Sequence, residues 1–401
     1  MHNLQKVSQQ TFWQILGKTV TAFSTFIILG IVARKYGPEG TGIFTLALTY
    51  LAIFYLLSDF GFNAHVLKQK EMNWQKLLGT RILWSGVLII IAVGTLPFWP
   101  FAGDEFSKSV LIGSLAILAS GIFITCNLIF QSKLRYDLSV LASSVGTLIG
   151  LGVFIYLSFQ NLPIPYLFLG HVLGWIFIAG LAFFLVKIAS SPSAPRNDEQ
   201  TIFPIYDIRY TKTLFKDSWL IAGTLFLNVV YFRADSFMIS IFRGNTEVGI
   251  YNIAYSIFQT ALVLPTFIMN AYYPMLLKSF KDVRLIGLGL LILAGLGILL
   301  TYLLSPFFVG LLTGGGFNGS VESLTILSLG FPAFFPSSLL MWIMVSKGKY
   351  KSMFAIYLIG LIANISLNFM FIPTYSFIAA SWITVISEYL ILTLQVVSLR
   401  K

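Results

Sequence analysis

The chain is divided along almost its whole length into about twelve apolar stretches, each long enough to cross a lipid bilayer. Hydrophobic residues make up 57% of the 401 residues and charged residues only 10%, so the remainder provides connectors but no large soluble domain. The pattern predicts an all-α integral membrane protein with about twelve transmembrane helices. The stretches are 12–33, 40–62, 79–101, 109–131, 139–159, 164–187, 218–241, 248–275, 285–309, 320–346, 352–372 and 376–398.

Lysine and arginine are unevenly divided between the two sets of loops that alternate along these stretches. Of the 26 such residues, twenty fall in one set of loops and four in the other. The first set includes both chain ends and also Arg81, which stands near the start of the third stretch. Cytoplasmic loops are the ones that retain Lys and Arg during membrane insertion. We therefore expect both termini in the cytoplasm, with Lys18 and Arg233 left inside stretches.

The net charge of +11 follows from the same distribution and does not indicate a nucleic-acid partner. Cations spread over every cytoplasmic loop set the orientation of the chain and lie well against anionic headgroups, so membrane lipids are the expected partners. Cys126 is the sole cysteine, which excludes an intrachain disulfide or a cysteine metal cluster. We expect neither a metal nor a cofactor. The polar first eleven residues lead into an apolar stretch without a cleavage pattern, which favours a retained first helix.

The sequence repeats itself at a separation of slightly more than 200 residues. The triplet 42–44 (Gly-Ile-Phe) matches 249–251 (Gly-Ile-Tyr) at an offset of 207, and 132–136 (Ser-Lys-Leu-Arg-Tyr) matches 346–350 (Ser-Lys-Gly-Lys-Tyr) at an offset of 214. Matches in the same order predict two pseudo-symmetric six-helix bundles around a central cavity, as in transporters built from parallel repeats. We expect an N-terminal bundle at 1–187, a cytoplasmic linker at 188–217 and a C-terminal bundle at 218–401.

Four runs of residues together carry a resemblance to a known family. They are 31–44 (IVARKYGPEGTGIF), 57–61 (LSDFG), 233–235 (RAD) and 248–255 (VGIYNIAY). These runs resemble bacterial polysaccharide flippases of the multidrug/oligosaccharidyl-lipid/polysaccharide exporter superfamily. The resemblance extends along nearly the whole chain and is closest to the branch that moves O-antigen or capsule units. Lipid II flippases of the superfamily usually carry fourteen spans, so twelve stretches disfavour that branch.

The resemblance implies a function for the chain. It implies transfer of undecaprenyl-diphosphate-linked oligosaccharide from the inner to the outer leaflet of the bacterial cytoplasmic membrane, by alternating access. The implied partners are this lipid-linked oligosaccharide and the polysaccharide polymerase machinery.

A diphosphate that crosses the bilayer needs cations inside it, and Lys18 and Arg233 are the candidates. Arg233 lies deep in the seventh stretch, where an isolated charge costs at least about 2.5 kcal/mol. Asp235 is two residues away and points to another side of a helix, so Arg233 needs a different partner. An anionic substrate would meet that need, and so would an ion pair between helices. Lys18 could instead extend its amine to the cytoplasmic headgroups.

Four further ionisable residues are candidates for ion coupling or charge balance, since such groups inside bilayers often relay protons. Each could equally be a hydrogen-bonded structural group. They are Asp235, Glu388, Asp59 and His171. Three tyrosines of the second half are candidates for sugar contacts, although most aromatic residues here should face lipid. They are Tyr231, Tyr251 and Tyr255.

Two other functions compete with the flippase. A multidrug/cation antiporter of the same superfamily would need an acidic pocket, whereas the deep charges here include cations. A membrane glycan polymerase or ligase would need catalytic groups on a substantial external loop, and no predicted external loop has that length. Gly314-Gly315-Gly316 lacks a following Lys-Ser/Thr and reads as a turn, not a phosphate loop. We therefore predict a transporter and not an enzyme.

Overall fold

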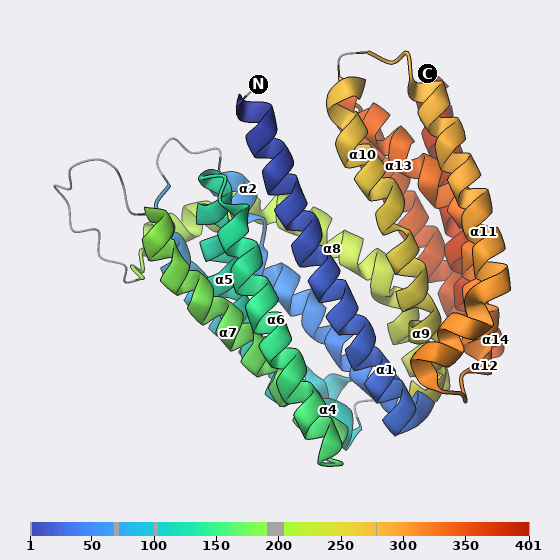
Figure 1. The fold of residues 1–401 in the computed structure, drawn as a ribbon, viewed down its shortest axis with the longest axis horizontal. Coiled ribbons are helices and arrows are strands. Elements are labelled where there is room, and N and C mark those ends of the chain that lie inside the picture. Colours follow the sequence, from blue (N-terminus) through green and yellow to red (C-terminus); the bar gives the residue numbers. More distant parts are fainter. Residues whose placement is uncertain (1, 68–71, 100–102, 191–203, 278, 401) are drawn as a thin grey trace. The chain divides into compact units, whose positions relative to one another are not determined.

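The computed structural model describes residues 2–67, 72–99, 103–190, 204–277 and 279–400, and these residues form helices with no β-strand among them (Figure 1). The predicted all-α fold is confirmed. The helices are α1 (His2–Asp59), α2 (Phe62–Val66), α3 (Trp74–Gly94), a 3-10 turn η1 (Leu96–Phe98), α4 (Asp104–Gly113), α5 (Leu115–Ser132), α6 (Tyr136–Phe159), α7 (Ile164–Ser190), α8 (Ile208–Arg243), α9 (Asn245–Ala261), α10 (Val263–Leu276), α11 (Val283–Thr313), α12 (Asn318–Ser328), α13 (Phe331–Ser346) and α14 (Tyr350–Arg400).

The number of membrane spans agrees with the prediction once two long helices are divided. In the described residues, eight helices are long and apolar enough to cross a membrane, or ten if each of two bent pairs is one span. α1 has 58 residues and α14 has 51, which is about twice the length that a bilayer needs. Each is broken at one residue with a positive φ, Gly37 in α1 (φ 64°) and Ser376 in α14 (φ 55°). Two spans in each of them bring the total to twelve.

The chain forms two compact units. Unit 1 contains Met1–Ile31 and Leu46–Val229, and unit 2 contains Val32–Thr45 and Val230–Lys401. A short segment of the first half of the chain therefore packs with the second half. The predicted division into an N-terminal bundle at 1–187, a linker at 188–217 and a C-terminal bundle at 218–401 stays a prediction. Part of the linker lies outside the described residues.

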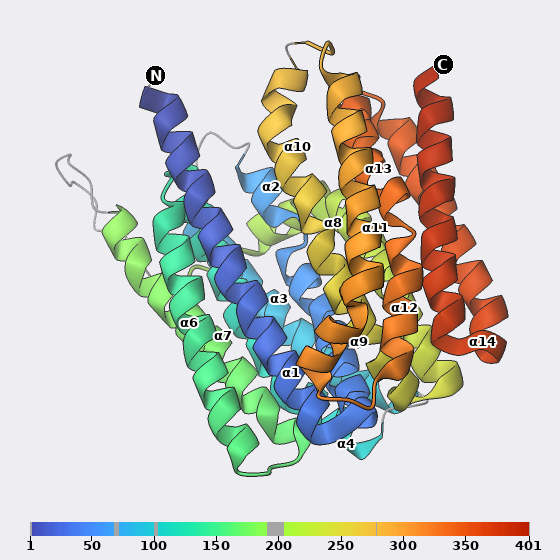
Figure 2. The ribbon, with the colours of Figure 1, turned by 45° about the vertical axis from the view of Figure 1, so that its right-hand side comes forward.

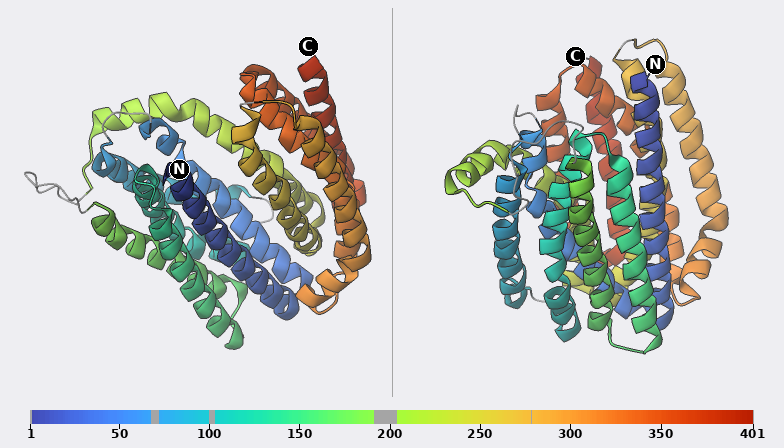
Figure 3. Two further views of the ribbon diagram at one scale, coloured as in Figure 1. Left: turned by 45° about the horizontal axis from the view of Figure 1, so that its top comes forward. Right: turned by 60° about the vertical axis from the view of Figure 1, so that its left-hand side comes forward.

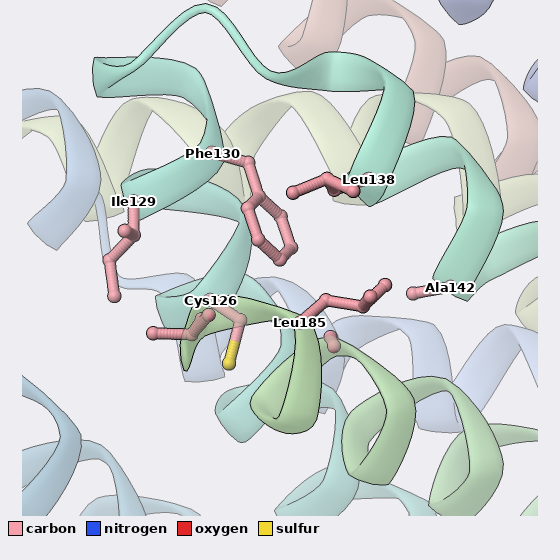
Figure 4. Packing of buried hydrophobic residues seen from close by; sticks show 8 residues of the cluster. Cys126, Ile129, Phe130, Leu138, Ala142 and Leu185 are labelled. Carbon is pink, nitrogen blue, oxygen red and sulfur yellow. The ribbon is translucent and has the colours of Figure 1, made fainter. Parts of the chain in front are cut away.

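In unit 1, α6 and α7 make the most extensive helix–helix contact, and α5 lies alongside both (Figure 3). Glycines allow the backbones of α6 and α7 to come close, since a Cβ added to Gly150 would lie 2.9 Å from the carbonyl oxygen of Gly170. Small residues are typical of helix contacts inside membranes. One buried cluster joins the three helices, and Figure 4 shows its members Cys126, Ile129, Phe130, Leu138, Ala142 and Leu185.

The first half of α8 also belongs to unit 1, because the residues before it are anchored to α3. The Lys76 amine donates a 2.8 Å hydrogen bond to the Asp207 carboxylate, and the amide of Ile205 donates to the carbonyl of Gln75. The bond from Lys76 lowers the pKa of Asp207 below its ordinary value. Within the predicted linker, residues from 208 onward are thus helical and packed against unit 1.

In unit 2, α12 contacts α9, α11 and α14, while α13 packs against α10, α11 and α14 (Figure 2). Aromatic rings fill the space between α9 and α13. Phe258 stacks on Phe331 with ring centroids 5.4 Å apart, and both side chains are buried. Such pairs contribute packing beyond their buried area.

The repeat in the sequence corresponds to a crossing inside unit 2. Gly37 and Gly244, which are 207 residues apart, both have positive φ and precede a new helical segment. A Cβ added to Gly42 would lie 1.8 Å from the carbonyl oxygen of Asn245, and one added to its counterpart Gly249 would lie 1.9 Å from that of Pro38. The two segments therefore cross in backbone contact, which only glycine permits at these positions.

The second repeated motif also has one geometry in both places. The amide of Arg135 donates to the carbonyl of Phe130, and the amide of Lys349, at the same offset of 214, donates to that of Met344. The turn that joins α5 to α6 is therefore repeated between α13 and α14.

Candidate functional site

A cluster of buried polar side chains surrounds Asp235, which lies on α8 in unit 2. Its carboxylate accepts hydrogen bonds from the Tyr251 hydroxyl at 2.8 Å, the Thr384 hydroxyl at 3.0 Å and the Asn368 amide at 2.5 Å. Asp235 is only 3% exposed, and its three donors are uncharged. The carboxylate is therefore buried with neutral donors, and no cation forms an ion pair with it in the described part of the chain.

The amides of α14 extend this cluster. Asn368 also donates to the side-chain carbonyl of Asn364 at 2.9 Å, and Asn364 donates to the Ser387 hydroxyl at 3.2 Å. Both asparagines are buried, and the side-chain carbonyl oxygen of Asn368 has no hydrogen-bond partner among the described residues. A buried acceptor without a donor is costly in a protein interior. The Asp235 cluster thus offers acceptor oxygens in excess of its donors.

The other second-half candidates lie beside this cluster. The Tyr231 hydroxyl donates to the carboxylate of Glu388 at 2.5 Å, and Glu388 is 4% exposed. Tyr251 and Tyr255 stack with ring centroids 5.4 Å apart and are both buried. In this structure Tyr251 serves as a donor to Asp235, and neither stacked ring is exposed to a sugar. The proposed sugar contacts stay predictions.

Arg233 is half-buried on α8 and forms no ion pair among the described residues. Asp235 bonds to other residues, as expected from the different sides of the helix that positions two apart occupy. Arg233 lies near enough to Tyr255 to interact with it electrostatically. Lys18 belongs to α1 in unit 1, and its side chain is exposed. The roles of both cations stay predictions.

The other two candidates of the first half have identified partners in unit 1. The Tyr55 hydroxyl and the Nε2 atom of His171 lie 2.7 Å apart, and the His171 ring also packs against Trp175. Asp59 forms an ion pair with Arg81 at 2.9 Å. Its side chain is 31% exposed, whereas that of Arg81 is fully buried.

The assignment of Arg81 to a cytoplasmic loop is wrong. Arg81 lies seven residues into α3 and donates to Asp59, to the side-chain carbonyl of Asn63 at 2.9 Å and to the Thr125 hydroxyl at 2.9 Å. The error arose because the predicted apolar stretch begins at residue 79, so that Arg81 lay at its edge. The helix itself begins at Trp74, which places Arg81 well inside it. A signal was available, since an acid that ends one span and a base that begins the next lie at the same side of the membrane.

Comparison with protein families places residues 7–280 in a family described as "Polysaccharide biosynthesis protein". Among curated proteins, the chain is 24% identical over 425 residues to a putative O-antigen transporter of Shigella flexneri, with 96% of each chain covered. It is 22% identical to the capsular polysaccharide biosynthesis protein CapF of Staphylococcus aureus, over 95% of this chain and 96% of that protein.

Two solved structures share the fold. The lipid II flippase MurJ in an inward closed conformation matches with a TM-score of 0.77 at 15% identity, covering 98% of this chain and 87% of MurJ. An inward-facing multidrug resistance MATE transporter matches with a TM-score of 0.67 at 11% identity, over 95% and 94% of the two chains. The family match covers more than half of the sequence, and the fold is shared with these two transporters over at least 95% of this chain. The chain therefore belongs to the family described as "Polysaccharide biosynthesis protein".

Proposed function

We propose that this protein moves undecaprenyl-diphosphate-linked oligosaccharide units from the inner to the outer leaflet of the bacterial cytoplasmic membrane by alternating access. Full-length similarity to an O-antigen transporter and the shared fold of a lipid II flippase support this proposal. The proposed orientation has both termini in the cytoplasm, which agrees with the Lys and Arg count even after Arg81 is removed from it.

Arg233 is the observation that carries the proposal. A half-buried guanidinium inside a membrane helix, without a carboxylate partner in the described residues, needs an anion to offset its desolvation. A diphosphate is such an anion. Lys18, an exposed cation of α1, is proposed as a further diphosphate contact.

The test measures lipid-linked units on each leaflet in cells that lack the gene and carry either the wild-type or a variant protein. We expect Arg233→Ala to abolish outer-leaflet delivery at a normal protein level, with partial activity for Arg233→Lys. The matched control is Arg243→Ala. Arg243 lies on the same helix, but its charge is already paired with Glu247. Loss of the Arg233→Ala protein from the membrane, with recovery of delivery when its level is restored, would assign Arg233 a structural role.

We also propose that the Asp235 cluster couples transport to a cation or proton gradient. A carboxylate with neutral donors and an unsatisfied amide oxygen could accept a proton or a monovalent cation. Asp235→Asn should then remove the dependence of flipping on the ion gradient in sealed vesicles. Flipping that continues unchanged after collapse of both proton and sodium gradients would contradict coupling at this cluster.

A multidrug/cation antiporter is the second candidate, favoured by two buried carboxylates, Asp235 and Glu388, in unit 2. It predicts that deletion increases drug sensitivity without trapping lipid-linked units. The flippase predicts the opposite pair of results, so both are measured on the same deletion strain.

A further inference from the structure

The first half of α8 carries a stripe of cations that the proposed transport of substrate does not use. Buried residues Leu214, Ser218 and Ala222 follow one another at intervals of four and hold this half of the helix against unit 1. Leu214 packs in a buried cluster with residues of α2, α3 and α5. The opposite side of the helix is therefore turned away from the rest of unit 1.

Three exposed cations occupy this outward side. They are Arg209, Lys212 and Lys216, and their spacing of three and four residues places them in one row about 10 Å long. None of them forms an ion pair in the described part of the chain. Asp217 lies on a different side of the helix from Lys216, and its carboxylate is 3.6 Å from the Nε2 atom of His65 in α2. We call Arg209, Lys212 and Lys216 the α8 stripe.

Apolar side chains border the α8 stripe on one edge. Trp219 is 64% exposed and Ile208 is 51% exposed, and both lie next to Lys212 around the helix. The chain that leads into α8 adds Ile205 and Tyr206, which are also exposed. A row of cations with apolar residues along one edge is the composition of a helix that lies in a membrane interface.

The position of this half-helix fits an interface as well. The apolar span of α8 begins only at Ile221, so the α8 stripe precedes it. In both views of Figure 3, this half of α8 (yellow-green) runs crosswise to the spanning helices of unit 1. A helix in that direction lies along the membrane surface and reaches several headgroups in succession.

We propose that the α8 stripe binds the headgroups of anionic phospholipids in the cytoplasmic leaflet, while Trp219 and Ile208 enter the adjacent acyl region. A row of this length exceeds a single phosphate group and suits two or more neighbouring lipids. Exposed cations bordered by exposed apolar side chains match a phospholipid, whose charged headgroup adjoins its acyl chains. Bound lipids would hold the start of α8 at the membrane surface during transport.

The test uses Trp219 as a reporter in the full chain, reconstituted in phosphatidylcholine vesicles. Its signal is the difference in fluorescence between wild type and Trp219→Phe. One vesicle set contains phosphatidylglycerol brominated near the headgroup end of its acyl chains, and the other contains phosphatidylcholine with the same bromine content. We expect the brominated anionic lipid to quench Trp219 about two-fold more strongly or better, because cations near a surface concentrate anionic lipid.

The Arg209→Gln/Lys212→Gln/Lys216→Gln variant should equalise the two lipids, and high salt should do the same for the wild type. The matched control is Lys281→Gln/Arg284→Gln, which removes two exposed cations of unit 2 and should keep the preference. If the triple variant does not fold, Lys212→Gln alone should reduce the preference.

Equal quenching by the two lipids in the wild type would overturn the proposal. An equal loss of preference in the control variant would do so as well, because it would show a general effect of charge. If polyprenyl diphosphate removes the preference at a concentration at which unbrominated phosphatidylglycerol does not, the α8 stripe is a substrate site and the proposal is wrong.

Discussion

Replacing Asp59 by asparagine isolates the effect of the buried charge on Arg81. The substitution preserves shape but removes the only carboxylate that pairs with this guanidinium in the described residues. Arg81 keeps four neutral acceptors, which are the backbone carbonyls of Ser58 at 3.2 Å and of residue 59 at 3.4 Å and the side chains of Asn63 and Thr125. Its side chain is fully buried, so water cannot replace the lost charge.

The expected loss follows from the burial of the two partners. Removing one partner of a buried ion pair typically costs about 3–5 kcal/mol. The side chain of Asp59 is 31% exposed, which weakens its attraction to Arg81, so we expect the low end, about 3 kcal/mol. For a unit of roughly 200 residues, this loss lowers the thermal midpoint by about 6–12 °C. The Asp59→Asn/Arg81→Met variant should recover part of the loss because no unpaired charge remains.

The measurement is thermal unfolding of the purified protein in detergent. Unfolding is monitored as the decrease in the fraction of protein that elutes as a monodisperse species after heating. Lys76→Met is the control, because it breaks the ion pair to Asp207, in which both side chains are partly exposed, and should change the midpoint less. The reasoning is refuted if Asp59→Asn lowers the midpoint no more than Lys76→Met does. It is also refuted if the Asp59→Asn/Arg81→Met variant is less stable than both Asp59→Asn and Arg81→Met.

Two further predictions concern unit 2. Gly42→Ala should abolish accumulation of folded protein, because the added Cβ would overlap a backbone oxygen. The control Gly86→Ala should be tolerated, because nothing lies within 4 Å of its added carbon. The amounts of the two proteins in the membrane test this prediction. Tyr231→Phe should destabilise the protein by about 1–3 kcal/mol, because the buried Glu388 loses its donor. An unchanged thermal midpoint in Tyr231→Phe would show that Glu388 finds another donor.

The helical membrane fold was predictable because its signal is repeated twelve times in the sequence. Apolar length identifies each span, and the Lys and Arg distribution orients the whole set. Boundaries were less certain, since polar residues such as Lys76 can begin a helix before the apolar stretch does. That uncertainty placed Arg81 in a loop, although the structure buries it completely.

The composition of the Asp235 cluster could not be predicted in the same way. Asp235 was identified as a candidate because a carboxylate inside a span needs partners. The partners Asn368 and Thr384 lie on α14, more than 130 residues away along the chain, and their distance depends on how the helices pack. Helix periodicity predicted only that the side chains of Arg233 and Asp235 point to different sides of the helix. The hydrogen bonds of Asp235 agree with this prediction.

The crossing in unit 2 restricts how the two halves of this chain could have diverged after a duplication. The amide of Asn252 donates a 2.8 Å hydrogen bond to the hydroxyl of Thr45, its own counterpart at an offset of 207. Gly42 and Gly249 contact each other's segments in the same way. A substitution at one position of a repeated pair alters the contact made by the equivalent position in the other repeat. The two positions of each pair must therefore change together. Neither half can be exchanged for that of a distant relative unless the replacement carries a matching partner for the residues that stay.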